Sequence, residues 1–230
     1  MSRDYGQYCG LARALDVIGD RWNLLIVRQL LLGPARYGDL REALSGIATN
    51  LLAGRLRDLE TAGVIERRLS EGGNAITYAL TPWGAELREP INGLIRWSTP
   101  LMIRGPEDDE FRPEWMSLAL EALFTGRVPA DQTAAVNISA ADHCIQLRAT
   151  PIGVDVGLPD GRDVDAVLSA DAPIVLGLAA GVLTIDAIAP AVVIDGDIAA
   201  LRAIFQAPSA AAGHSPPTVG EVTRRHPSRS

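Results

Sequence analysis

The first sixty residues place apolar side chains three or four positions apart, with short polar or glycine-containing breaks between the runs. Positions with this spacing lie on one face of a helix, so the pattern predicts a series of helices. The last two are short and are joined by a tight turn around Gly46, which is typical of a helix-turn-helix. The predicted helices cover residues 11–18, 21–32, 37–44 and 49–61.

A period of two replaces the helical spacing after Gly63. Residues 64–69 and 75–80 flank a turn-forming stretch, and in the second run larger apolar side chains alternate with Thr77 and Ala79. This pattern predicts a β-hairpin. Thr81-Pro82 then supplies an N-cap and a first-turn proline for a further helix. Pro90 lies in that helix and predicts a bend, and the apolar stripe consists of Leu87, Ile91, Leu94 and Ile95.

The rest of the chain predicts a second domain of mixed helices and strands. An acidic stretch at 107–110 separates it from the first, and a Pro-, Ser- and Ala-rich stretch follows it. The fold class is therefore α+β, with a winged helix-turn-helix followed by a small α/β domain. The predicted strands cover 134–139, 144–149, 153–158, 164–169 and 192–195, and the helices cover 114–124, 173–180 and 198–205. The expected divisions are 1–100 for the first domain, 101–112 for a linker, 113–206 for the second domain and 207–230 for a disordered tail.

Charge is distributed unevenly along the chain. The net charge is -7, but residues 1–100 hold 12 arginines and 11 acidic residues, and most of the acidity lies in residues 101–206. Any binding of DNA must therefore depend on where the arginines lie rather than on bulk charge. We expect a cytoplasmic protein with free thiols and no membrane segment, because the start lacks an apolar signal core and the longest uncharged apolar stretch is short.

The predicted helix at 49–61 has one apolar face and one face suited to DNA. Leu52, Leu56 and Leu59 share one side, which we assign to the core. The opposite side carries Asn50, Ala53, Gly54 and Arg57. Asparagine pairs with adenine and arginine with guanine in the major groove, and small side chains permit close approach. The alternative is an ordinary amphipathic surface helix.

Residues 8–98 resemble the HxlR-type winged-helix regulators, which are related to the MarR group. The segments that carry the resemblance include 15–22, 33–37, 55–60 and 78–84. It implies a homodimer that binds a palindromic operator in double-stranded DNA, with dimer contacts made by the first helix and the helix after the wing. By position it implies that Thr49, Asn50, Gly54 and Arg57 face bases. Phosphate-binding or structural roles are implied for Arg36, Arg55, Arg67 and Arg68, and Asn74 lies with the last two in the expected wing.

Two residues depart from the pattern of that family. Ala48 stands where a serine often caps the helix, which leaves Thr49 as the expected cap. Several family members are similar to thiol-based sensors with a cysteine at the position of Cys9, but Gly10 replaces the proline that usually follows. Arg13 and a helix N-terminus near Cys9 are expected to lower its pKa. Redox sensing through Cys9 and a merely buried thiol remain alternatives.

Residues 113–206 resemble a sterol carrier protein type two domain, mainly through 172–183 and 192–201. The resemblance implies a small α/β fold with a tunnel for a small apolar ligand, whereas the same pattern also suits a packed dimerisation domain. We therefore expect a ligand-responsive transcriptional regulator. The alternative is a lipid-type carrier or binding module whose winged helix contacts protein. We expect no enzyme, cofactor or metal site, because adjacent His143 and Cys144 would point to opposite faces of a strand.

Overall fold

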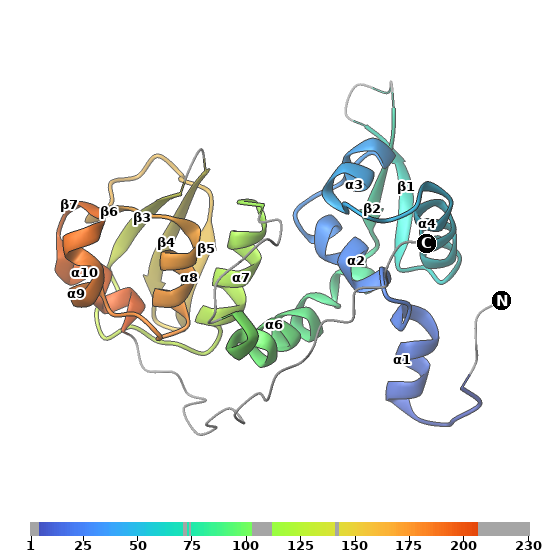
Figure 1. Ribbon diagram of the computed structural model, residues 1–230, viewed down its shortest axis with the longest axis horizontal. Helices are drawn as coiled ribbons and strands as arrows, with labels where there is room; N and C mark the ends of the chain where they lie inside the picture. Colours follow the sequence, from blue (N-terminus) through green and yellow to red (C-terminus); the bar gives the residue numbers. More distant parts are fainter. Residues whose placement is uncertain (1–4, 71–72, 74, 103–111, 141–142, 207–230) are drawn as a thin grey trace, which may run out of the picture. The chain divides into compact units, whose positions relative to one another are not determined.

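A computed structural model of the chain describes residues 5–70, 73, 75–102, 112–140 and 143–206. The chain divides into two compact units, 1–96 and 97–230, which are described separately (Figure 1). Asn74, the acidic stretch at 107–110 and the tail at 207–230 lie outside the described residues. Within them, no helix has the length and apolar character needed to cross a membrane.

The first unit is a winged helix-turn-helix. Its two-stranded hairpin is joined by an isolated bridge to Ala35, which exchanges backbone hydrogen bonds of 3.0 and 2.8 Å with Tyr78. Its core is formed by fully buried side chains of α2, α3, α4 and β1, among them Ile26, Leu40 and Leu56. The elements are α1 (Gly10–Ile18), α2 (Asn23–Leu31), α3 (Tyr37–Ala43), α4 (Thr49–Thr61), β1 (Ile65–Leu69), β2 (Ile76–Leu80) and α5 (Pro82–Ala85), followed by α6 (Arg88–Met102), which continues into the second unit.

The helix expected after the hairpin is two helices, and the predicted bend at Pro90 is wrong. A Cβ atom at Gly84 would collide with the carbonyl oxygen of Val64, so α5 packs directly on the backbone before β1. The Thr81 hydroxyl accepts a hydrogen bond from the Gly84 N–H at 3.0 Å and caps this short helix. The helix is interrupted at residues 86–87, and α6 begins at Arg88. Pro90 falls in the first turn of α6, where its missing N–H is not needed, whereas Pro100 lies inside the helix.

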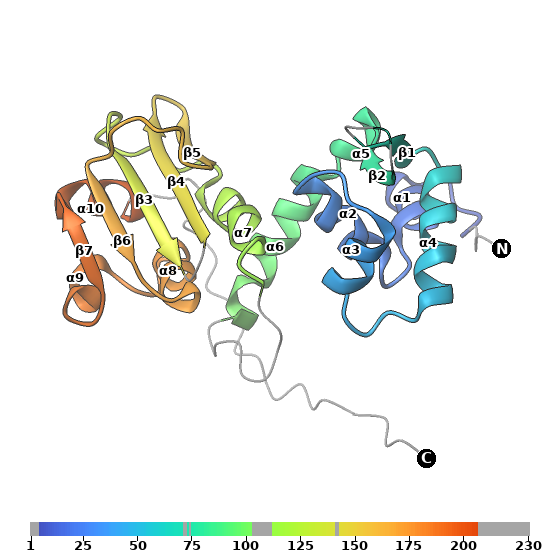
Figure 2. The ribbon, with the colours of Figure 1, turned by 90° about the horizontal axis from the view of Figure 1, so that it is seen from above.

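The second unit contains a five-stranded sheet in the order β5-β4-β3-β6-β7 (Figure 2). The β3–β6 pair is parallel and the other pairs are antiparallel. The short α9 and the 3₁₀ turn η1 are absent from the sequence prediction. The elements are α7 (Trp115–Phe124), β3 (Ala135–Ala140), β4 (His143–Thr150), β5 (Gly153–Gly157), β6 (Ala166–Ser169), α8 (Ala172–Ala179), α9 (Ile185–Ile188), η1 (Ala189–Ala191), β7 (Val193–Gly196) and α10 (Ile198–Phe205).

The helices of the second unit cover one face of its sheet. Alternate strand residues such as Ile138, Leu147 and Leu168 are fully buried and share one apolar cluster with side chains of α7, α8, α9 and α10. The rings of Phe124 and Phe205 lie 5.6 Å apart in this cluster. Neighbouring strand residues point to opposite faces of a sheet, so the residues between these buried ones lie on the other face. Several of them are polar.

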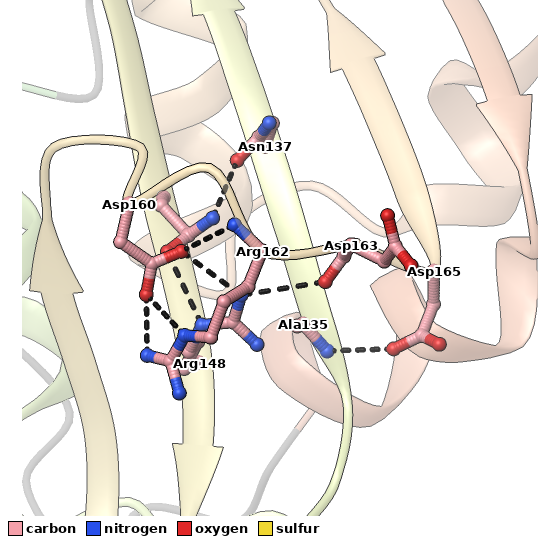
Figure 3. Close-up of polar contacts among 8 residues, drawn as sticks. Ala135, Asn137, Arg148, Asp160, Arg162, Asp163 and Asp165 are labelled. Carbon is pink, nitrogen blue, oxygen red and sulfur yellow. Dashed lines mark hydrogen bonds and ion pairs between the residues drawn. The ribbon is translucent and has the colours of Figure 1, made fainter.

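That opposite face carries a chain of polar contacts that fastens the β5–β6 loop to the sheet (Figure 3). Gln146 donates to the side-chain oxygen of Asn137 at 3.3 Å and accepts from Arg148 Nε at 3.2 Å. Arg148 Nη2 lies 3.2 Å from the Asp160 carboxylate, which also accepts from Arg162 Nε at 2.6 Å. Gln146 is buried, and these contacts satisfy its amide.

Candidate DNA-binding interface

The recognition helix α4 has the two faces that the sequence predicts. Leu52, Leu56 and Leu59 are at most 1% exposed and pack into the core of the first unit. On the other side Asn50 and Arg57 are exposed, while Ala53 and Gly54 are half-buried. A Cβ atom at Gly54 would meet no described atom within 4 Å, so open space lies in front of this part of the helix. The surface can therefore approach another molecule closely.

The start of α4 lies beside the helix that precedes it. Ala48 is the N-cap residue, and its side chain makes no capping hydrogen bond. Thr49 is the first helical residue, so the expectation that Thr49 caps the helix is wrong. The Tyr37 hydroxyl donates a hydrogen bond to the Thr49 carbonyl oxygen at 2.9 Å, which ties α3 to α4. Uncapped N–H groups at a helix start are suited to phosphate oxygens.

Most of the arginines around α4 are already paired with acidic side chains. Arg55 contacts Asp20 and also lies 3.1 Å from Asp58. Arg67 is paired with Glu60, and Arg68 with Glu66. These pairs favour structural roles for the three arginines, the second of the two roles that the resemblance implies.

Arg57 and Arg36 differ from the paired arginines. Arg57 is exposed and forms no ion pair within the part of the chain that the structure describes. The Arg36 side chain is exposed, and its backbone N–H donates to Asp39 Oδ2 at 2.9 Å. Of the predicted DNA-binding set, Thr49, Asn50 and Arg57 are each exposed, whereas Asn74 lies outside the described residues.

Helix α1 presents apolar side chains to solvent. Leu11 is 68% exposed and Leu15 is 39% exposed, although both lie on an amphipathic helix. A groove of about 830 Å³ runs beside this helix. Its lining comes mainly from α1, α5 and the start of α6, and includes Ala14, Val17, Trp83, Leu87 and Pro90.

The apolar stripe predicted on the helix after the hairpin lies partly in the core and partly at the surface, because Ile91 is buried while Leu94 is 48% exposed.

Comparison with known proteins identifies the family of this chain. Residues 17–104 match the family model described as HxlR-like helix-turn-helix. The HTH-type transcriptional regulator YvaP of Bacillus subtilis is 35% identical over 88 residues, which are 38% of this chain and 82% of that protein. The chain belongs to the HxlR-like helix-turn-helix family. The family resemblance predicted from residues 8–98 is thereby confirmed.

Two other relatives have a similar level of sequence identity to this chain. The HTH-type transcriptional regulator sll1512 of Synechocystis is 37% identical over 84 residues, which are 36% of this chain and 62% of that protein. YodB of Bacillus subtilis, also an HTH-type transcriptional regulator, is 34% identical over 86 residues, which are 37% of this chain and 77% of that protein. The chain therefore covers less than two thirds of the Synechocystis relative.

Cys9 of this HxlR-like chain is the N-cap residue of α1, and its thiol is exposed. Hydrogen bonds from the backbone N–H groups of Ala12 and Leu11 lower the pKa of the thiol. Arg13, which was expected to contribute, is not among the groups that lower this pKa. Among the described residues no group of three or more metal-binding side chains is present, and both cysteines are free.

Three residues that shape the interface were missed by the sequence analysis: Asp20, Tyr37 and Glu60. Each lies in a segment that carries the HxlR resemblance, and its place in such a segment is the signal in the sequence that could have identified it. Their contacts reach Arg55, Thr49 and Arg67, which belong to other secondary-structure elements. Periodicity within one helix does not predict such contacts.

Proposed function

We propose that this chain is a sequence-specific transcriptional regulator that binds operator sites in double-stranded DNA as a homodimer. The observation that carries the proposal is the exposed face of α4, where Asn50 and Arg57 stand opposite three buried leucines. Their amide and guanidinium groups match adenine and guanine edges in the major groove. The family membership supports the same function, since its relatives carry the name HTH-type transcriptional regulator.

The proposal assigns different tasks to the residues around α4. Thr49, Asn50, Gly54 and Arg57 face the bases, and Ala53 allows the helix to approach them closely. Arg36 and the uncapped start of α4 bind phosphates. Arg55 ties α4 to the segment before α2 through Asp20, whereas Arg68 pairs with Glu66 within β1.

The homodimer is supported by the exposed apolar residues of α1. Leu11 and Leu15 remain exposed among the described residues of their unit, and the adjacent groove has an apolar lining that includes Trp83 and Leu87. A second copy of the chain would bury these side chains. Two copies related by a two-fold axis would present two α4 helices to a palindromic operator.

Selection from a pool of random DNA duplexes tests the proposed function. The full-length protein is expected to enrich a palindromic sequence whose affinity exceeds that of random duplex by about a thousandfold or more. The affinity is also expected to fall as salt rises, because bound phosphates release counterions. Equal binding of every duplex, or binding of none, would reject sequence-specific regulation and favour a binding module whose winged helix contacts protein.

A finer part of the proposal is that a small apolar ligand in the second unit modulates DNA binding. Support comes from the sterol-carrier resemblance and from the apolar cluster between the sheet and its helices. The test compares operator affinity with and without a fatty acid, for the full chain and for a chain ending at residue 106. A response confined to the full chain supports ligand control, whereas an unresponsive full chain favours a packed dimerisation domain.

A second candidate function, thiol-based redox sensing, is favoured by the environment of Cys9. Its thiol is exposed at the start of a helix, and backbone hydrogen bonds lower its pKa. Both properties increase the reactivity of a thiol toward oxidants. Redox sensing requires that an oxidant changes operator affinity through this residue.

A further inference from the structure

The recognition helix and the first strand of the hairpin are joined by a bidentate ion pair. Glu60 lies in the last turn of α4 and Arg67 in the middle of β1. Arg67 Nε donates to Glu60 Oε1 and Arg67 Nη2 to Glu60 Oε2, both at 2.8 Å. These hydrogen bonds lower the pKa of Glu60, so the carboxylate is charged at neutral pH. Two parallel hydrogen bonds fix direction as well as distance.

The pair stands at the end of the face that is proposed to read bases. Ala53, Arg57 and Glu60 are separated by four and three positions, so they lie along one side of α4. With Arg67 and Tyr78 they line a pocket of about 250 Å³ between the helix and the hairpin. A change in the Glu60–Arg67 contact therefore alters how the hairpin is held next to Arg57.

The charges argue against Arg67 as a phosphate ligand. A phosphate that took the guanidinium from Glu60 would leave a carboxylate unpaired beside the DNA backbone, where like charges repel. Glu60 is 29% exposed and Arg67 51% exposed, so both remain close to the surface that DNA would cover. The arrangement is more favourable when the pair remains closed.

We propose that Arg67 is a positioning residue, which acts on DNA recognition through Glu60 and does not bind a phosphate itself. The closed pair neutralises Glu60 and holds the hairpin at the angle that α4 needs in the major groove. This inference rests on the proposed function and adds to it the residue pair that sets the geometry of the reading surface.

The substitution Glu60→Gln separates the two roles by the sign of its effect. If Arg67 binds phosphate, removing the competing carboxylate strengthens operator binding. If the pair positions the hairpin, operator binding weakens by about two- to fivefold, as for an exposed ion pair with good geometry. Glu66→Gln is the matched control, because it makes the same charge change on β1 and affects only the contact with Arg68. It is expected to leave operator affinity unchanged or slightly raised.

Arg67→Lys gives an independent test, since lysine keeps the charge but cannot form two parallel hydrogen bonds with a carboxylate. Positioning predicts a loss similar to that of Glu60→Gln and no further loss in the double variant, because both changes remove one interaction. Thermal midpoints within about 2 °C of the wild type show that the variants are folded.

The outcomes also separate this inference from the proposed function. If the wild-type protein and the Glu66→Gln variant both bind operator no better than random duplex, the proposed function and the positioning role are both overturned. A selective wild type whose affinity is kept or raised by Glu60→Gln, or losses from Glu60→Gln and Arg67→Lys that add in the double variant, overturn the positioning role alone.

Discussion

The hydroxyl of Tyr37 donates a hydrogen bond to the carbonyl oxygen of Thr49 at 2.9 Å. Tyr37 begins α3 and Thr49 begins α4, so this contact joins the starts of the two helices that form the helix-turn-helix. It fixes their separation at the end of α4 that carries Asn50.

Tyr37→Phe removes only this hydrogen bond. We expect a loss of about 0.5–1.5 kcal/mol in the free energy of unfolding, because the ring stays packed while one intramolecular hydrogen bond is lost. Urea unfolding monitored by circular dichroism measures it. Tyr8→Phe is the control, since Tyr8 is fully exposed, and it should leave stability unchanged. Equal stability of all three proteins would contradict a structural role for the contact.

Arg57→Ala tests the proposed reading surface directly. We expect specific operator binding to weaken by about 1–3 kcal/mol while the fold is retained, because the side chain is exposed opposite the leucine face. Fluorescence anisotropy with operator and random duplex measures the change. Arg41→Ala removes another exposed arginine, on α3, and should not alter the ratio of specific to random binding. Unchanged operator affinity in a folded Arg57 variant would exclude this helix as the reader.

Gly54→Ala should affect stability and DNA binding in opposite directions. Alanine is favoured over glycine in a helix by about 1 kcal/mol, and its Cβ atom meets no described neighbour within 4 Å. The free protein is therefore expected to become more stable. The added methyl group would occupy space that the base edges need, so operator affinity should fall.

Gly93→Ala in α6 is the matched control for Gly54→Ala. Its Cβ atom would lie 3.9 Å from Arg96 Nη2, an ordinary contact, so stability should again rise. Operator affinity should stay the same because Gly93 lies on α6, outside the proposed reading surface. A Gly54 variant that is more stable and binds operator normally would show that DNA does not approach this position closely.

Cys9→Ser should leave operator binding unaltered under reducing conditions, because Cys9 lies on α1 and is outside the proposed reading surface. With hydrogen peroxide, the redox hypothesis predicts that wild-type affinity changes and that the serine variant is insensitive. Cys144→Ser is the control for the other free thiol. An identical response of the wild type and the Cys9 variant to peroxide would exclude sensing through this thiol.

Asp160→Asn should destabilise the second unit at neutral pH, by an amount that begins to shrink as the pH falls below about 4. Hydrogen bonds from Arg162 and from Arg148 lower the pKa of Asp160 below its usual range. A carboxylate with a lowered folded-state pKa stabilises the protein above its unfolded pKa of about 3.9, and loses this contribution as the pH falls. Urea unfolding at pH 7, 4 and 3 should give a difference between wild type and variant that shrinks in acid. A constant difference would exclude this electrostatic cause.

The sequence predicted α4 well because its signal extends over several turns. Leu52, Leu56 and Leu59 repeat on one face, and both the bounds of the helix and the burial of these side chains agree with the prediction. By contrast, α9 has four residues, too few to establish a period. The close approach of Gly84 in α5 to Val64 is a tertiary contact that local pattern does not contain.

Prediction of the candidate site was limited by side-chain pairing. The sequence identified the exposed Asn50 and Arg57, because helical periodicity alone places them opposite the core. It could not assign Arg55 or Arg67, whose partners Asp20 and Glu60 lie 35 and 7 positions away. Which arginines remain available for DNA depends on these long-range pairs and therefore on the tertiary fold.

In the second unit the parallel pairing of β3 with β6 determines when that unit can fold. Val136 pairs with Ala166, so the centre of the sheet cannot form until the whole intervening segment has left the ribosome. The first unit closes its hairpin locally, with Leu69 opposite Ile76, and its core residues end near Ile95. During synthesis we therefore expect the helix-turn-helix to acquire its native structure while the second unit is still an incomplete nascent chain.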